Sequence, residues 1–252
     1  MNNLTFLTFK NLLKKKETIV YFVFALFPFL LIIVDLFDTN FMQLSAPDNS
    51  LSCLGFIGAV MTVQHQLVLP LIILIYLVST TFYTEITNGI LFLYKDMNRR
   101  KILNAKIFSL IGVYISYVGI LFLSSLVTYY AYLKNLSYTS GTFLPLKAID
   151  IQDALLEILG IVFVGLLCIL LATTLSLNFS SGFTMLGTVL FLLLSSIAPK
   201  LTMLKYFFPN GYEVQIDTIG FIPAILGTLI VFIVYAVFMY GYANKKFKKV
   251  EY

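Results

Sequence analysis

The sequence predicts an all-α membrane protein with six transmembrane helices, and three observations lead to this prediction. Apolar and aromatic residues make up 60% of the 252 residues and charged residues only 12%, whereas a soluble domain is nearer half apolar and a quarter charged. Six apolar runs approach the length of about 20 residues that a helix needs to cross the hydrocarbon core. Basic residues flank several of these runs. Composition therefore excludes a disordered chain, a disulfide scaffold and a soluble enzyme.

The six predicted spans follow one another along the whole chain. They are 18–37, 67–83, 107–132, 154–177, 183–197 and 219–243. The second and fifth are short, and the apolar stretch 54–63 just before the second predicts either a longer tilted helix or a segment that dips into the membrane. We expect a single transmembrane domain over 1–252 and no nucleotide-binding domain.

The positions of lysine and arginine predict the orientation of the spans. Most of the 17 basic residues lie in three segments: Lys10, Lys14, Lys15 and Lys16; Lys95, Arg99, Arg100, Lys101 and Lys106; and Lys245, Lys246, Lys248 and Lys249. By the positive-inside rule, both termini and the loop after the second span are cytoplasmic, in a plasma (cytoplasmic) membrane. The same distribution argues against a nucleic-acid partner, because the cations flank apolar runs.

The segment before the first span has the pattern of an amphipathic helix. Phe6, Phe9 and Leu13 fall on one face, and Thr8, Asn11 and Lys15 lie on the opposite side. Such a helix is expected to lie on the inner membrane surface. A frayed basic anchor is the alternative interpretation.

The chain lacks the residue patterns of the common intramembrane chemistries. His65 is the one histidine, so a metal site with two imidazoles and the H-E-x-x-H protease motif are excluded, and no metal or cofactor site is predicted. The segment 182–188 has G-x-x-x-x-G spacing but no phosphate-binding lysine. We therefore expect a non-catalytic membrane subunit, with any ATP hydrolysis on a separate chain.

Carboxylates are absent from the centres of the predicted spans, which argues against a proton- or sodium-coupled carrier. Asp150, Asp153 and Glu157 share one helical face by their spacing. They are interpreted as acidic residues favoured by a helix N-terminus, with a cargo-attracting ring as the alternative.

The loop after the second span carries the most informative pattern. Glu85 precedes Gly89 by four residues, an apolar stretch runs from Ile90 to Tyr94, and a basic run beginning at Arg99 leads into the third span. A short helix parallel to the membrane would present such an apolar stretch to a cytoplasmic partner. The alternative, an interfacial loop with basic anchors, explains the basic run but not the apolar stretch.

This loop resembles the coupling-helix region of type-2 ABC exporter permeases, which commonly reads E-x-x-x-G-T-L-x-x-L-L followed by S-R-x-x-I-L-x-x-K. The matching residues are Glu85, Gly89, Ile90, Leu91, Leu93, Arg99, Ile102, Leu103 and Lys106. Ile90 replaces the frequent threonine, and 95–98 departs from the usual break with a proline. The motif covers about a tenth of the chain, and the number and order of the spans extend the resemblance to most of it.

The resemblance implies a permease homodimer above two copies of a cytoplasmic ABC ATPase, which would bind the ATP and Mg. It implies that Glu85, Asn88 and Gly89 position the coupling helix and that Ile90, Leu91 and Leu93 contact the ATPase. Arg99 and Lys101 would anchor the exit of this segment to lipid headgroups or to the partner. The resemblance also places the dimer seam at spans one and five.

The connection 198–218 contains broken apolar pieces around Pro199 and Pro209. Such backbone is tolerated at membrane depth only where protein shields it. In the resembled family this region forms short re-entrant helices, which makes Pro199, Phe207, Phe208 and Pro209 candidates for an outer gate. An ordinary outer loop is the alternative.

The predicted function is export of amphipathic or lipid-like cargo by the membrane subunit of an ABC exporter. The chain's size and low charge resemble compact Gram-positive permeases for antimicrobial or toxin peptides, such as exporters of phenol-soluble modulins and lantibiotic immunity permeases. Lipid or teichoic-acid-type cargo is an alternative. A stand-alone membrane channel or receptor without an ATPase partner is the competing class.

Overall fold

The computed structural model describes residues 2–35, 47–94 and 97–250. Apart from one isolated bridge between Leu51 and Thr139, the regular structure of these residues is helical. Five helices are long and apolar enough to cross a membrane: Leu69–Thr87, Arg99–Asn135, Ala148–Ser176, Ser181–Lys200 and Phe221–Phe247. The all-α prediction is confirmed over the described residues, and helices of this length and hydropathy indicate a membrane-embedded protein.

The last four predicted spans each correspond to one of these helices. They are α7 (Arg99–Ala131), α8 (Ala148–Ser176), α9 (Ser181–Ile197) and α11 (Phe221–Phe247). Helix α7 begins well before the predicted boundary at 107, because Asn98 caps its N-terminus by accepting a hydrogen bond from the Arg100 amide at 2.9 Å. Hydropathy alone identifies the apolar part of a helix and does not predict a polar end, such as the start of α7, that extends beyond the apolar run.

The first predicted span, 18–37, is not one continuous helix. It is divided into α2 (Lys16–Phe24) and α3 (Phe29–Asp35), and residues 36 and 37 lie outside the described part. Between the helices the backbone makes tighter turns, such as the hydrogen bond from the Phe29 amide to the Leu26 carbonyl at 3.0 Å. Pro28 lacks an amide hydrogen and disfavours a helical residue before it, which accounts for the interruption.

The second predicted span, 67–83, is part of a longer broken helix. Helix α4 (Cys53–Leu67) is followed by α5 (Leu69–Ser79), a π-helical turn η1 (Thr80–Thr84) and α6 (Glu85–Thr87). The break lies at Val68, whose φ of 59° is left-handed. The stretch 54–63 therefore lies in a helix of its own, α4, and both expectations for its place in the membrane stay predictions.

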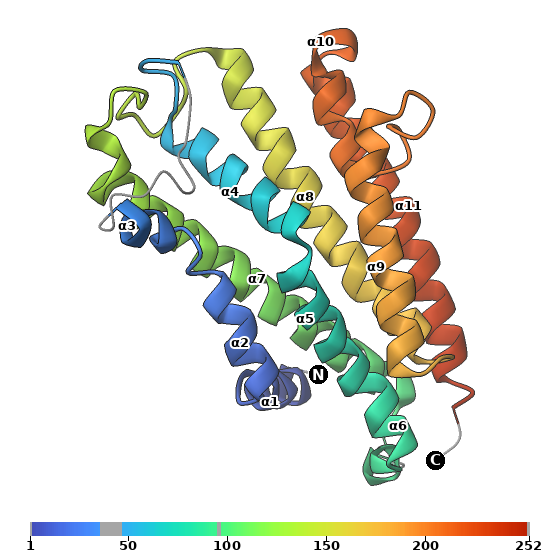
Figure 1. Cartoon of the computed structure of the whole chain (residues 1–252). Helices are drawn as coiled ribbons and strands as arrows, with labels where there is room; N and C mark the ends of the chain where they lie inside the picture. Colours follow the sequence, from blue (N-terminus) through green and yellow to red (C-terminus); the bar gives the residue numbers. More distant parts are fainter. Residues whose placement is uncertain (1, 36–46, 95–96, 251–252) are drawn as a thin grey trace.

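Figure 1 shows α4–α5, α7, α8, α9 and α11 running side by side. Helix α8 is central and packs against α4, α5, α9 and α11. The N-terminal helix α1 (Asn2–Leu13) crosses α7 near the end of the bundle that also carries α6 and the end of α11. We call this the α6 end, and we call the end that carries the connections 136–147 and 198–218 the far end.

Candidate functional site

The segment 85–94 begins where α5 ends in a π-helical turn. The Thr81 carbonyl in this turn accepts a hydrogen bond from Lys106 Nζ on α7 at 2.9 Å. Gly89, with a φ of 67°, ends α6 in the left-handed conformation that glycine adopts without a steric cost. The 3₁₀ helix η2 (Ile90–Tyr94) follows. Gly89 of the sequence motif is therefore the residue that turns the chain out of the helix.

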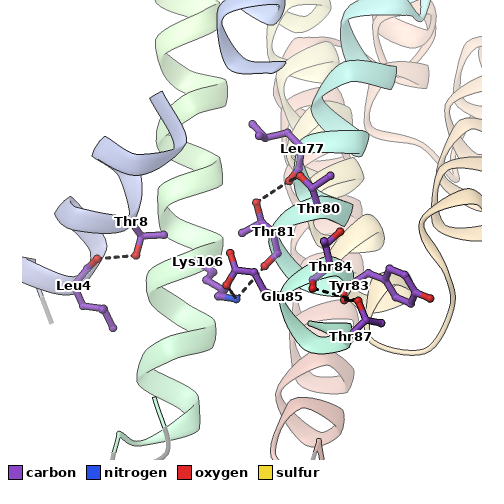
Figure 2. A network of polar contacts seen from close by, with 10 residues as sticks. All are labelled: Leu4, Thr8, Leu77, Thr80, Thr81, Tyr83, Thr84, Glu85, Thr87 and Lys106. Atoms are coloured by element: carbon purple, nitrogen blue, oxygen red, sulfur yellow. Dashed lines mark hydrogen bonds and ion pairs between the residues drawn. The ribbon is translucent and has the colours of Figure 1, made fainter. Parts of the chain in front are cut away.

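An ion pair joins the two halves of the sequence motif. Lys106 Nζ and Glu85 Oε2 are 2.7 Å apart, and the side chain of Lys106 is 5% exposed against 23% for that of Glu85. Figure 2 shows the lysine reaching from α7 to both Glu85 and the Thr81 carbonyl. The ring of Phe82 adds a cation–π contact, with its centroid 5.3 Å from the ammonium group. A buried ammonium group requires such compensation, so these contacts hold the start of 85–94 against α7.

Helix α1 covers this ion pair from one side. Its Thr8 and Asn11 line a cleft together with Lys15, Glu85 and Lys106. Helix α1 is held on α7 by a hydrogen bond from Ser109 Oγ to the Thr5 carbonyl at 2.9 Å. The predicted N-terminal helix is thus present, and two of its polar residues, Thr8 and Asn11, line the cleft beside the ion pair.

The apolar residues of η2 divide into an inward and an outward set. Leu91 is 5% exposed and lies against Arg99, Ile102, Phe247 and Val250, whereas Ile90 and Phe92 are exposed, Phe92 at 56%. Asn88 is exposed as well, and the side chain of Leu93 lies outside the described part. Leu91 therefore fastens the turn to the bundle. Ile90 and Phe92 are the apolar groups presented outward. Phe92 lies in the predicted apolar stretch 90–94 but is not among the residues that match the family motif.

Arg99 fastens the end of α11. Its Nη1 donates hydrogen bonds to the carbonyls of Phe247, at 3.5 Å, Lys248, at 3.2 Å, and Val250. These carbonyls lie at a helix C-terminus, where a cation is favoured. Arg99 was predicted to anchor the segment to headgroups or to a partner. Within the described residues it joins α7 to α11, while Lys101 is exposed.

The connection 198–218 is folded against the bundle at the far end. It contains the 3₁₀ turns η4 (Ala198–Lys200), η5 (Pro209–Gly211) and η6 (Glu213–Gln215), followed by α10 (Ile216–Ile219). Turn η5 packs on α8 at Gly160, where a Cβ atom would lie 2.7 Å from Asn210 Cα. Thr228 Oγ1 of α11 donates to the Pro209 carbonyl at 3.3 Å. The connection therefore lies between α8 and α11.

The four candidate gate residues lie in different surroundings. Phe208 is 9% exposed, with its ring centroid 5.3 Å from that of Phe191 on α9, and Pro209 is buried. Pro199 is half-buried, and Phe207 is exposed at 55%. The structure thus brings Phe208 and Pro209 into the bundle and leaves Phe207 on the surface.

A buried polar cluster lies between these two sites, beside the break at Val68. His65 is 5% exposed, and its Nε2 lies 3.3 Å from the hydroxyl oxygens of both Ser195 and Ser196 on α9. The Ser195 carbonyl accepts a hydrogen bond from Asn210 Nδ2 at 2.9 Å. Since His65 Nδ1 has no partner among the described residues, no carboxylate orients this imidazole as in a Ser-His-Asp triad. The cluster joins the helix break to the connection 198–218.

Acidic groups gather where η6 meets α8. Burial first, and then the negative charges of Glu157 and Asp153, raises the pKa of Glu213 from 4.5 to about 7. Thr62 Oγ1 of α4 donates a hydrogen bond to Glu157. Two of the three carboxylates that were interpreted as helix-start residues, Asp153 and Glu157, therefore also lie near the connection 198–218.

We expect this pKa to make the attachment of η6 depend on pH. The folded state holds a proton on Glu213 up to a higher pH than the unfolded state does, so its contribution to stability falls as pH rises from about 4.5 to about 7. Hydrogen exchange of residues 209–219 measured from pH 5 to pH 8 is expected to show decreasing protection after correction for the intrinsic exchange rate. The decrease is expected to be smaller in Glu213→Gln. An equal decrease in both proteins would contradict this assignment.

Comparison of the chain with protein-family models, with curated proteins and with solved structures gives no match in any of the three.

Proposed function

We propose that this chain is the membrane-spanning subunit of an ATP-driven exporter of the type-2 ABC kind. The observation that carries the proposal is the Glu85–Lys106 ion pair, which joins the two halves of the resembled motif and holds an exposed apolar turn at one end of the bundle. In this proposal the α6 end is cytoplasmic, in the plasma membrane. Helices α2 and α3 together make the first of six passes.

The partners in this proposal are two cytoplasmic ABC ATPase subunits, which bind the ATP and Mg, and a second copy of this chain. Ile90 and Phe92 contact the ATPase, since they are the apolar side chains that η2 presents outward. The cargo is amphipathic or lipid-like, most simply an antimicrobial or toxin peptide. This chain performs no bond chemistry.

Movement of the turn would reach the far end through the broken helix. An inward force on η2 reaches α5 and then the break at Val68 through α6 and the turn η1, which are continuous with α5, while the Glu85–Lys106 pair holds this segment to α7. There His65 joins the helix to Ser195, whose carbonyl binds Asn210 of the connection 198–218. Closure of the ATPases would in this way loosen the packing of Phe208 and Pro209 and open the path outward.

The proposal is tested by purifying this chain together with a candidate ABC ATPase from the same cell. Phe92→Asp is expected to abolish co-purification of the ATPase and its stimulation, because it places a charge in an apolar contact. Phe143→Asp, which changes an exposed phenylalanine at the far end, is the matched control and is expected to retain both. If the ATPase binds neither the unchanged chain nor the control, the stand-alone channel or receptor replaces the exporter.

The break at Val68 gives a second test of the same mechanism. A β-branched residue in the left-handed region costs on the order of 1–3 kcal/mol, so neighbouring contacts must hold it. His65→Phe removes the hydrogen bonds to α9, worth about 1 kcal/mol each, and keeps a ring of similar size. We expect it to broaden the distribution of distances between spin labels at Val63 and Tyr76, which flank the break. Gln66→Phe, at an exposed neighbouring position, is expected to leave the distribution narrow, and broadening by both substitutions would contradict a specific role for His65.

A further inference from the structure

The α6 end carries a surface of exposed cations drawn from two distant parts of the chain. Arg100 and Lys101 lie in the first turn of α7, and Lys245, Lys246, Lys248 and Lys249 lie at the end of α11. The hydrogen bonds from Arg99 to the Lys248 and Val250 carbonyls bring the two groups together. These six exposed residues are named the basic surface. Neither 99–106 nor 240–250 contains a carboxylate.

The position of the basic surface on α11 indicates what it contacts. Phe238, Tyr242, Lys245 and Lys249 follow one another at spacings of four, three and four residues, so they share one face of the helix. Phe238 is 73% exposed and Tyr242 is 48% exposed, in an apolar helix that packs on α8 by one side and has few fully buried residues. This order, an exposed apolar face followed by tyrosine and then lysine, follows the change from hydrocarbon to headgroups at a membrane surface. The lysines therefore lie at headgroup level.

Two of the charges on α7 have no compensating partner within the described residues. The N-terminus of a helix carries a partial positive charge, so cations in its first turn are disfavoured. Arg99 is compensated by the carbonyls of α11, whereas Arg100 and Lys101 are exposed and no hydrogen bond from their side chains is present in the described structure. The lysines of α11, by contrast, lie at a helix C-terminus, where cations are favoured. An anion bound beside Arg100 and Lys101 would compensate their charge.

We propose that the basic surface binds the headgroups of anionic phospholipids in the leaflet at the α6 end. The binding requires only that the chain lies in a membrane, and it does not depend on an ATPase partner. Arg99 is the positioning residue, because it holds the end of α11 beside the first turn of α7. The phosphates accept hydrogen bonds from the lysine and arginine side chains and neutralise both groups together.

The test measures which lipid the protein retains. The full chain is reconstituted into vesicles of equal parts phosphatidylcholine and phosphatidylglycerol, extracted with a mild detergent, and its bound lipids are quantified by mass spectrometry. We expect the unchanged protein to be enriched in phosphatidylglycerol and to release it in high salt. Replacement of the four α11 lysines by glutamine is expected to lower the enrichment by at least tenfold, because each lysine near an anionic surface contributes about 1 kcal/mol. Replacement by arginine is expected to preserve it.

Two controls separate this binding from general charge effects. Lys134→Gln with Lys147→Gln and Lys200→Gln removes exposed cations at the far end and is expected to leave the enrichment unchanged. Arg99→Gln keeps all six charges of the basic surface but frees the end of α11, so it is expected to lower the enrichment severalfold. The salt measurement uses the unchanged protein and needs no variant to fold. The proposal is overturned if the unchanged protein retains both lipids in the vesicle ratio or if the glutamine variant retains as much phosphatidylglycerol as the arginine variant.

Discussion

Glu85→Gln is expected to destabilise the chain by about 3–5 kcal/mol, the usual cost of removing one partner of a buried ion pair. It leaves the ammonium group of Lys106, which is 5% exposed, without a carboxylate. Lys106→Met is expected to cost less, because the side chain of Glu85 is 23% exposed and can reach water. Equilibrium unfolding of the purified protein in detergent measures both differences.

The double variant Glu85→Gln with Lys106→Met shows what the pair does. Removing both charges also removes the need to compensate them, so stability is expected to return to within about 1–2 kcal/mol of the unchanged protein. Coupling to the ATPase is not expected to return, because the turn 85–94 is no longer held to α7. Recovery of both stability and ATPase stimulation would show that the pair is structural only. If the double variant instead loses the sum of the stabilities lost by the two single variants, the two residues do not interact.

Gly160→Ala is expected to displace the connection 198–218 from α8. The new Cβ atom would lie 2.7 Å from Asn210 Cα, and a backbone atom cannot move aside as the end of a flexible side chain can. Overpacking of this kind costs about 1–3 kcal/mol, and it would weaken the hydrogen bonds that Ser195 and Thr228 make with 209–210. Faster hydrogen exchange and easier proteolysis at 209–211 are the expected results.

Gly119→Ala is the matched control for this substitution. Gly119 also lies inside a long helix, α7, but within the described part of the chain no atom lies within 4 Å of its Cβ position apart from its own helix backbone and chain neighbours. Alanine there is expected to be neutral or to stabilise the helix by up to about 1 kcal/mol. If both substitutions leave 209–211 equally protected, the close contact between Gly160 and Asn210 does not hold the connection in place.

The sequence predicted most residues of the candidate coupling site but not the contacts between them. Glu85, Gly89 and Leu91 all take part in holding or shaping the turn, because the E-x-x-x-G pattern and the apolar stretch are local in the chain. Lys106 lies in the matched motif, but the sequence did not predict it as a site residue. Its contact with Glu85 joins two different helices, and the sequence pattern does not show that they meet. The apolar pattern 90–94 contained both Ile90 and Phe92, whereas the family motif matched only Ile90. Neither pattern distinguishes the outward side of a short turn from the inward side.

The sequence by itself determined that this chain is a helical membrane protein and where four of its membrane helices run. In a bilayer each backbone polar group must be satisfied within its own segment, so long apolar runs have little choice but to form helices. The interruption between α2 and α3 also has a local cause, Pro28, although hydropathy alone predicted one continuous span there. The break at Val68 is different, since valine has no preference for a left-handed φ of 59°.

Only the tertiary structure decided that Arg99 reaches the end of α11, that His65 contacts α9 and that Asn210 packs on Gly160. Each of these contacts joins residues at least 50 positions apart. These contacts form only when the helices pack against one another. The spacing of residues along the chain therefore does not predict them.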